Sequence, residues 1–305
     1  MTARTQRGEA LGLRLAFALA LALALALALA LALALAGCGA DSGAALDAGP
    51  ADGDLPREAG PDSARPDAAL VDLDQDGLDD GAEQALAQAY LPYLSLSPTD
   101  GCARSGLIFR LRPHPAGGRC LLATYVWLYD RDCGSPGGIG AHDGDDETFG
   151  VTIDPTLPAP QGLRAIRAIS HQGTLCERIS ECGDLSTLTA CETLPRAGTP
   201  WPALWSSKNK HGGYVNKTAR CTTFGTCIDT CEDNATPTVP PLVNVGEPGH
   251  PLVRNLTTQG FITSANGWTS AGLSNYDPWG MSDFGGAGSV AGDLVDTAFD
   301  TPACP

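Results

Sequence analysis

Residues 120–153 read CLLATYVWLYDRDCGSPGGIGAHDGDDETFGVTI, and this stretch decides the fold. Apolar and aromatic residues dominate Cys120–Tyr129 and Phe149–Ile153, whereas Gly and Asp are frequent between them. Short runs of this kind, bounded by turn residues, are typical of β-strands. Similar runs occur at Leu107–Arg112, Leu163–Ser170 and Trp201–Ser207, with weaker ones at Val215–Cys221 and Phe261–Thr263. The sequence therefore predicts a mostly β (α+β) fold, an antiparallel β-sandwich with long loops.

Helical patterns are few. Asp80–Tyr90 places Leu86, Ala89 and Tyr90 on one face, and Pro92 ends the pattern. A second short helix is predicted for Asp184–Leu194, where Asp184 can cap the first turn.

The N-terminus has the features of an export signal. Three Arg precede an almost pure Leu/Ala run, and Leu35-Ala36-Gly37-Cys38 resembles the lipoprotein box of bacterial exported proteins. We expect cleavage before Cys38 and attachment of a lipid to its thiol, which would anchor the chain to a bacterial membrane in the cell envelope. The alternative is that the apolar run remains as a spanning helix.

The remaining chain divides by composition. Residues 1–37 form the signal peptide, and 38–70 form a lipidated acidic tether rich in Ala, Gly, Asp and Pro. Residues 71–94 form a loop-and-helix segment, and 95–305 form the β domain. Ten cysteines follow Cys38, and an even number in an exported chain predicts a disulfide framework of five bridges. The spacing does not determine their pairing.

The chain is strongly acidic, with a formal net charge of −16. Removal of residues 1–37, which carry three Arg and one Glu, makes it −18. This charge argues against nucleic acid as a partner and suits divalent cations. The sequence gives no indication of oligomeric state.

Residues 72–83, DLDQDGLDDGAE, fit the calcium-loop pattern D-x-D-x-D-G-x5-E at every ligand position. The pattern places oxygen ligands at alternate positions, a sharp turn at Gly77 and a bidentate carboxylate at the end. The predicted ligands are Asp72, Asp74, Asp76, Leu78 through its carbonyl, Asp80 and Glu83. We expect a single Ca²⁺ here with a structural role, because the chain contains no second loop of this kind.

A second polar cluster, His142–Glu147, precedes the strand at Phe149–Ile153. A loop entering a strand alternates its side chains, so His142, Asp145 and Glu147 can converge on one ion. Asp132, at the end of the preceding strand, is a further ligand. One imidazole with carboxylates suits Ca, Mg, Mn or Zn. The alternative is a solvated acidic turn.

Four stretches in order resemble a known family. Leu86–Leu94, Tyr125–Asp130 with His142–Glu147, Ser170-His171, and Ser207–Tyr214 resemble motifs of the vacuolar protein sorting-associated protein 62-like proteins, over about residues 80–285. The segment His142–Glu147 is also similar to the H-x-x-D-W-E core of the necrosis-inducing toxins.

Members of that toxin family are secreted β-sandwiches that bind a divalent metal and damage membranes by engaging sphingolipid head groups. The resemblance implies that His142, Asp145 and Glu147 are metal ligands and that Asp132 matches the family's upstream Asp. One position departs from the motif, since Asp146 stands where the family has Trp.

Further polar residues are predicted to recognise the ligand. His171 and His211 follow strand-like runs, and Lys208, Lys210 and Tyr214 offer donors to an anionic or sugar head group. The leading hypothesis is metal-assisted binding of a glycan or lipid head group, with cytolysin-like activity implied by the resemblance. A metal-dependent hydrolase with His171 or His211 as base, and a structural envelope protein whose metals only stabilise it, are the alternatives.

Overall fold

The computed structural model describes residues 70–102, 105–135, 137–183, 191–217, 228–259, 276–280 and 288–300. All of them belong to one compact unit, 68–305. Among these described residues, no helix has both the length and the apolar composition needed to cross a bilayer.

The predicted helix is confirmed as α2 (Asp80–Ala89). Asp79 caps it, since its side chain accepts a hydrogen bond from the Ala82 N–H at 2.9 Å. The helix buries Ala87 on the main sheet, where the Tyr125 hydroxyl donates to the Ala87 carbonyl at 2.9 Å.

The main sheet has six strands in the order β10-β2-β3-β4-β5-β6. All neighbours are antiparallel except β10 and β2, which are parallel. The apolar runs predicted its central strands correctly. The strands are β2 (Ser105–Pro113), β3 (Leu121–Asp132), β4 (His142–Ile153), β5 (Leu163–Ser170), β6 (Arg178–Cys182) and β10 (Leu242–Asn244).

The sequence predicted a loop at 142–147, and this prediction is wrong. The acidic run forms the first half of β4. It pairs with the end of β3, so that Tyr129 lies opposite Asp145 and Trp127 opposite Glu147. The aromatic partner strand buries these carboxylates, which explains why a sequence this polar forms a strand.

A smaller sheet has the order β1-β8-β7, with β9 paired to β8. Its strands are β1 (Tyr93–Leu96), β7 (Thr193–Arg196), β8 (Thr199–Ser206) and β9 (Gly213–Tyr214), and β1 and β8 are parallel. The remaining elements are β11 (Gly246–Glu247), β12 (His250–Pro251), η1 (Leu256–Gln259), η3 (Pro278–Gly280), α4 (Val290–Asp293) and η4 (Thr297–Phe299).

Three weaker predictions fall in or near this sheet. The helix Asp184–Leu194 is wrong at its end, where Thr193 and Leu194 pair with β8, and 184–190 lie outside the described residues. The strand Val215–Cys221 is wrong at its start, since β9 ends at Tyr214, and its part from 218 onward lies outside the described residues. Phe261–Thr263 also lies outside them.

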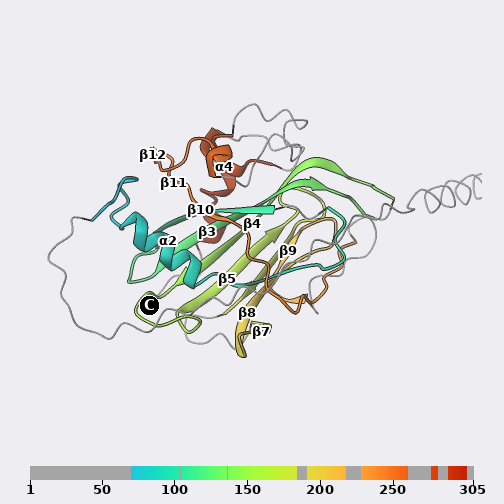
Figure 1. Ribbon diagram of the computed structural model, residues 1–305, viewed down its shortest axis with the longest axis horizontal. Helices are drawn as coiled ribbons and strands as arrows, with labels where there is room; N and C mark the ends of the chain where they lie inside the picture. The colour runs from blue at the N-terminus through green and yellow to red at the C-terminus, as the bar shows by residue number, and fades with distance from the viewer. Residues whose placement is uncertain are drawn as a thin grey trace, which may run out of the picture. The chain divides into compact units, whose positions relative to one another are not determined.

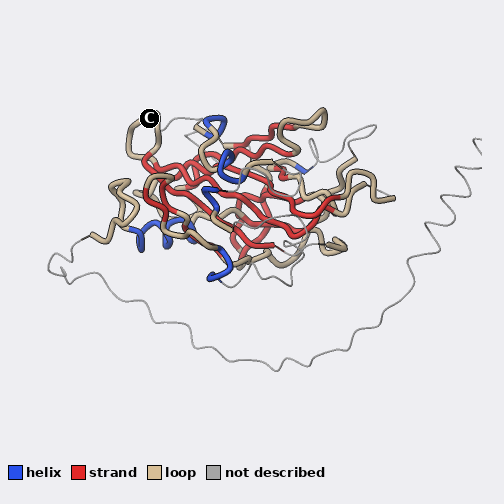
Figure 2. The backbone as a smooth tube through the Cα atoms, turned by 90° about the horizontal axis from the view of Figure 1, so that it is seen from above, coloured by secondary structure: helices blue, strands red, loops and turns tan. Residues whose placement is uncertain are grey.

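The main sheet is covered on both faces (Figure 1). Residues such as Phe109, Tyr125, Trp127 and Val151 form one core with α2 and the smaller sheet. Alternate residues such as Val126 and Leu128 form a second core with the C-terminal segment that includes α4. Strands are the main regular structure of the described residues, long loops connect them, and the helices are few and short (Figure 2).

Disulfides tie the loops. Cys182–Cys191 and Cys102–Cys133 join described residues, with Cα–Cα distances of 4.8 and 6.1 Å. Cys120, Cys176 and Cys231 are disulfide-bonded as well. The other three cysteines of the predicted framework, Cys221, Cys227 and Cys304, lie outside the described residues.

Candidate functional site

A cavity of about 690 Å³ opens where β3 and β5 end and β4 begins. Its wall is strongly acidic, because six carboxylates line it together with two histidines and a single lysine. These residues are Asp132, Asp145, Asp146, Glu147, Asp229, Asp293, His142, His171 and Lys210.

Three of these residues form a cluster with metal-ligand geometry. Asp132, His142 and Asp145 each place one ligand atom within 4.8 Å of the others. The β3–β4 register holds Asp132 opposite His142, and His142 Nε2 lies 3.4 Å from Asp132 Oδ2. His142 Nδ1 lies 2.6 Å from the Gly144 carbonyl, which can only accept a hydrogen bond. Nδ1 therefore carries a proton, and Nε2 is the nitrogen that a metal ion would bind.

Two basic side chains, Lys210 and His211, lie beside this cluster and pair with its carboxylates. Lys210 Nζ lies 2.5 Å from Asp132 Oδ2. His211 is fully buried and bridges two carboxylates, with Nδ1 2.8 Å from Asp145 and Nε2 3.3 Å from Asp100. Its ring stacks on Tyr129 at 3.8 Å between centroids. Burial acts to lower the pKa of His211, but the bonds to the two carboxylates outweigh it and raise the pKa to about 9.

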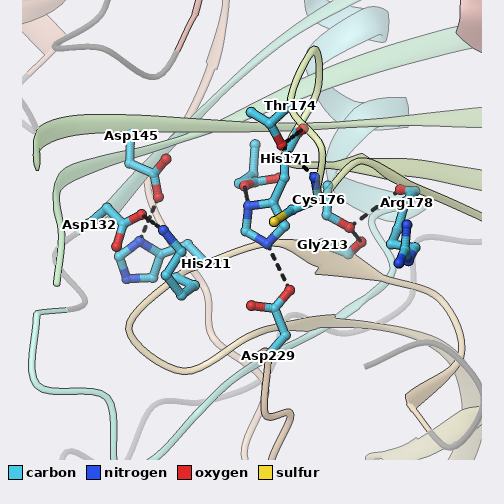
Figure 3. A network of polar contacts seen from close by, with 12 residues as sticks. Asp132, Asp145, His171, Thr174, Cys176, Arg178, His211, Gly213 and Asp229 are labelled. Carbon is cyan, nitrogen blue, oxygen red and sulfur yellow. Dashed lines mark hydrogen bonds and ion pairs between the residues drawn. The ribbon is translucent and has the colours of Figure 1, made fainter. Parts of the chain in front are cut away.

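A second histidine lies farther along the same wall (Figure 3). His171 Nε2 is 2.7 Å from Asp229 Oδ2, and Nδ1 is 4.0 Å from Glu147 Oε1. The buried Tyr214 hydroxyl also donates to Asp229. Burial, and then the neighbouring Asp145, raise the pKa of Glu147 well above its usual value. Burial alone would raise the pKa of Asp229 too, yet its bond to His171 leaves that pKa lowered.

The structure brings some predicted ligand-binding residues together and not others. His171 and Lys210 line the cavity, as does Glu147, although Glu147 is not part of the close cluster. His211 and Tyr214 are buried behind the wall, where they hold Asp145 and Asp229. Lys208 does not line the cavity, and its Nζ lies 4.0 Å from Glu232 Oε1.

Sequence reasoning missed three acids that shape this region. Asp100 holds His211, Asp229 holds His171, and Asp293 faces the cavity from α4. Each lies far along the chain from His142. The sequence offered little that could have identified these acids. For Asp229 the one feature was its position between two cysteines, Cys227 and Cys231.

The 72–83 loop also has ligand geometry. Asp74, Asp76 and Glu83 form one cluster with ligand atoms within 4.8 Å, and Asp72, Asp74 and Asp80 form another. The sharp turn falls at Gly77, whose φ of +95° favours glycine. The Leu78 N–H donates to Asp76 Oδ1 at 2.8 Å. Asn244 of β10 donates to Glu83 Oε2 at 2.9 Å, which ties the loop to the main sheet.

Several of these loop oxygens are buried without partners. Asp74 is 1% exposed, and neither of its carboxylate oxygens has a hydrogen-bond partner among the described residues; the same holds for Asp76 Oδ2 and Glu83 Oε1. Burial, reinforced by neighbouring acids, raises the pKa of Asp74 to about 7 and that of Glu83 to about 8. Converging buried oxygens without donors fit a calcium ion.

No protein-family model and no curated protein matches the chain. Among solved structures, it is distantly similar to one described as "Toxin fold for microbial attack and plant defense" and to "NLPPya in complex with glucosamine". Each is 14% identical with a TM-score of 0.34, covering 69% of this chain and 93% of that chain. Necrosis and Ethylene inducing Protein 2 from the causal agent of cocoa's Witches Broom disease is 12% identical with a TM-score of 0.30, covering 61% and 78%.

Proposed function

We propose that the protein binds a divalent cation at Asp132, His142 and Asp145 and uses the adjoining cavity to bind a glycan or a lipid head group. The observation that carries the proposal is the position of this ligand cluster on the wall of a cavity of about 690 Å³. Cavities of roughly 300–1,000 Å³ are of the size that encloses small ligands. A bound ion would attract hydroxyl or phosphate oxygens of the ligand.

The charge of the wall favours ligands that also carry an ammonium group. Six carboxylates line the cavity, and among its described lining residues only Lys210 is a lysine or arginine. An amino sugar, or a choline or ethanolamine head group, combines a cationic group for these carboxylates with oxygens for the metal ion.

The rim of the cavity supports a lipid source for the head group. Ile139 and Ile228 line the cavity and are 71% and 48% exposed, and Leu175, between the lining residues Thr174 and Cys176, is fully exposed. Exposed aliphatic side chains around a polar pocket suit the interface of a bilayer. Membrane damage of the cytolysin kind belongs to the same proposal.

The location that we propose is the bacterial cell envelope. A lipid on Cys38 would anchor the chain, and the acidic segment up to residue 70 would hold the β domain away from the membrane surface. The Ca²⁺ that we propose at 72–83 would then secure the first helix of the domain to β10 through Glu83 and Asn244.

The geometry argues against one of the two bases of the hydrolase alternative. Both ring nitrogens of His211 lie in ion pairs within the protein, so this residue cannot take a proton from a substrate. His171 is held through Nε2 by Asp229 at 2.7 Å, and its Nδ1 lies 4.0 Å from Glu147 Oε1, so it is the remaining candidate for a base.

Binding experiments with the full chain test the proposal. Glucosamine and vesicles of phosphatidylcholine with sphingolipid are the probes, each with calcium or with chelator. We expect His142→Ala to weaken binding at least tenfold, as chelation does for the wild type, whereas Asp143→Asn, on the same strand but outside the cavity, binds normally. Equal binding by His142→Ala and wild type would contradict the proposal. A melting temperature that falls on chelation, with no binding by the metal-loaded protein, would support the structural envelope protein instead.

A further inference from the structure

Asp146 lies on the opposite face of β4 from Asp145 and Glu147, because side chains alternate along a strand. Its partner in the sheet is Leu128, a member of the second apolar core. Asp146 is 7% exposed, and its carboxylate accepts no hydrogen bond from an N–H or hydroxyl group of another described residue; the side chain beside it is the carboxyl group of Asp293. A charged group in such a place is costly unless a cation compensates it.

The group that faces Asp146 is another carboxylate. Burial, and then the charge of Asp293, raise the pKa of Asp146 well above its usual value. Burial likewise raises the pKa of Asp293 to about 6. In the described part of the chain, neither residue forms an ion pair with a Lys, Arg or His.

The neighbouring atoms are oxygen-rich and leave room. The Thr148 hydroxyl, two residues along the same face, lies 2.7 Å from Asp293 Oδ2. Gly288 lies against the pair, since a Cβ at this position would be 3.7 Å from Asp146 Oδ1. Asp146, Thr148, Gly288 and Asp293 all line the cavity, so an ion has access from solvent.

We propose that Asp146 and Asp293, with the Thr148 hydroxyl, bind a divalent cation of the calcium class, distinct from the ion proposed at Asp132, His142 and Asp145. Carboxylate and hydroxyl oxygens without nitrogen or sulfur are the donor set of hard cations such as Ca²⁺ and Mg²⁺. The site depends on Asp146, the position at which this chain differs from the H-x-x-D-W-E motif. It does not rest on the proposed function, because it uses no residue of the other cluster.

Calcium binding to the full chain, measured by equilibrium dialysis, tests this site with calcium alone as the probe. We expect Asp293→Asn and Asp146→Asn each to bind one ion fewer than the wild type. His142→Ala should lose a different ion, so that His142→Ala combined with Asp293→Asn loses two. Asp143→Asn is the matched control and should lose none. Folded variants of Asp146 and Asp293 that bind as many ions as the wild type would overturn the proposal, whatever His142→Ala does.

Thermal unfolding gives a second test, in which the effect of Asp293→Asn should change sign between chelator and calcium. Without an ion the two acids can lie side by side only when one of them takes up a proton. Asn at 293 removes this requirement and can still accept the Thr148 hydrogen bond. Asp293→Asn should therefore melt higher than the wild type in chelator, by roughly 2–4 °C, and the order should reverse in calcium. If Asp293→Asn melts lower in chelator or does not fold, the acid pair is stabilising without an ion and the proposal is overturned.

Discussion

The 72–83 loop and the cavity wall are both acidic, but they differ in how their charge is compensated. In the cavity, Lys210 pairs with Asp132 and His211 pairs with Asp145, so cations of the chain face the carboxylates. No loop carboxylate pairs with a Lys, Arg or His in the described part of the chain, and Asp74 is buried without any partner. On the proposal of a Ca²⁺ in the loop, that ion would supply the positive charge that the loop lacks. At the His142 cluster, Lys210 and His211 already supply positive charge, so we expect its stability to depend less on an ion.

The strongest test of this difference removes the internal cation. His211→Ala leaves Asp100 and Asp145 buried and facing each other without the imidazolium between them. Loss of one member of a buried charge pair costs about 3–5 kcal/mol, so we expect the free energy of unfolding in urea to fall by about this amount. Lys208→Ala, which removes a partly exposed cation outside the cavity, should change it little. A small effect of His211→Ala would mean that the cavity is not compensated by the chain.

Calcium removal should affect the loop next most strongly. An ion present at 100 times its dissociation constant stabilises the folded state by about 2.7 kcal/mol. Chelation should therefore lower the melting temperature of the wild type, and Asp76→Ala, which removes one predicted ligand, should lose most of that response. If Asp76→Ala responds to calcium like the wild type, the loop does not need the ion and the contrast between the two regions fails.

The pH dependence without calcium sharpens the comparison. The folded-state pKa values of Asp74 (about 7) and Glu83 (about 8) exceed their ordinary values of 3.8 and 4.5, so the folded loop binds more protons than the unfolded chain. The contribution of these two groups to the free energy of unfolding therefore falls as the pH rises from about 4 to about 8. Urea unfolding of the calcium-depleted protein at pH 5 and pH 8 measures this fall. Glu83→Gln should reduce it, and saturating calcium should remove it.

The smallest expected effect concerns Lys210. Lys210→Met removes the ammonium group that neutralises Asp132, so the cluster at His142 should bind its metal ion about tenfold more tightly, which corresponds to about 1.4 kcal/mol. Calorimetric titration with the 72–83 loop already saturated measures the change. Unchanged or weaker binding would show that Lys210 does not compete with the ion.

The sequence predicted the parts of the fold that depend on local pattern. The apolar runs around Tyr125 and Val151 located the central strands, and Pro92 and the acidic first turn located α2. The smaller sheet could not be predicted in this way. The parallel pairing of β1 with β8 and the pairing of Leu194 with Trp201 depend on tertiary contacts, which leave no pattern in the local sequence. The beginning of β4 was missed because its acidic residues form a strand only against the aromatic face of β3.

The candidate site divides in the same way. Spacing along one strand was enough to propose His142 and Asp145 together, and the ends of the β3–β4 hairpin add Asp132. Sequence spacing does not determine whether a side chain faces the cavity or is buried behind its wall. The burial of His211 and the position of Lys208 outside the cavity were therefore not predicted. Asp293 was missed because it is brought to β4 by the C-terminal segment, 145 residues from Thr148.

The Cys102–Cys133 disulfide affects when the cavity can be completed. It joins the loop after Asp100, which holds His211, to the loop after Asp132, which belongs to the metal cluster. Disulfides form in oxidising compartments and rarely in a reducing cytoplasm. For the exported chain that we propose, this bond would therefore form only after the chain reaches oxidising surroundings, and it would then fix the two loops to each other. On that proposal, maturation of the site would be separated in time and place from synthesis of the chain.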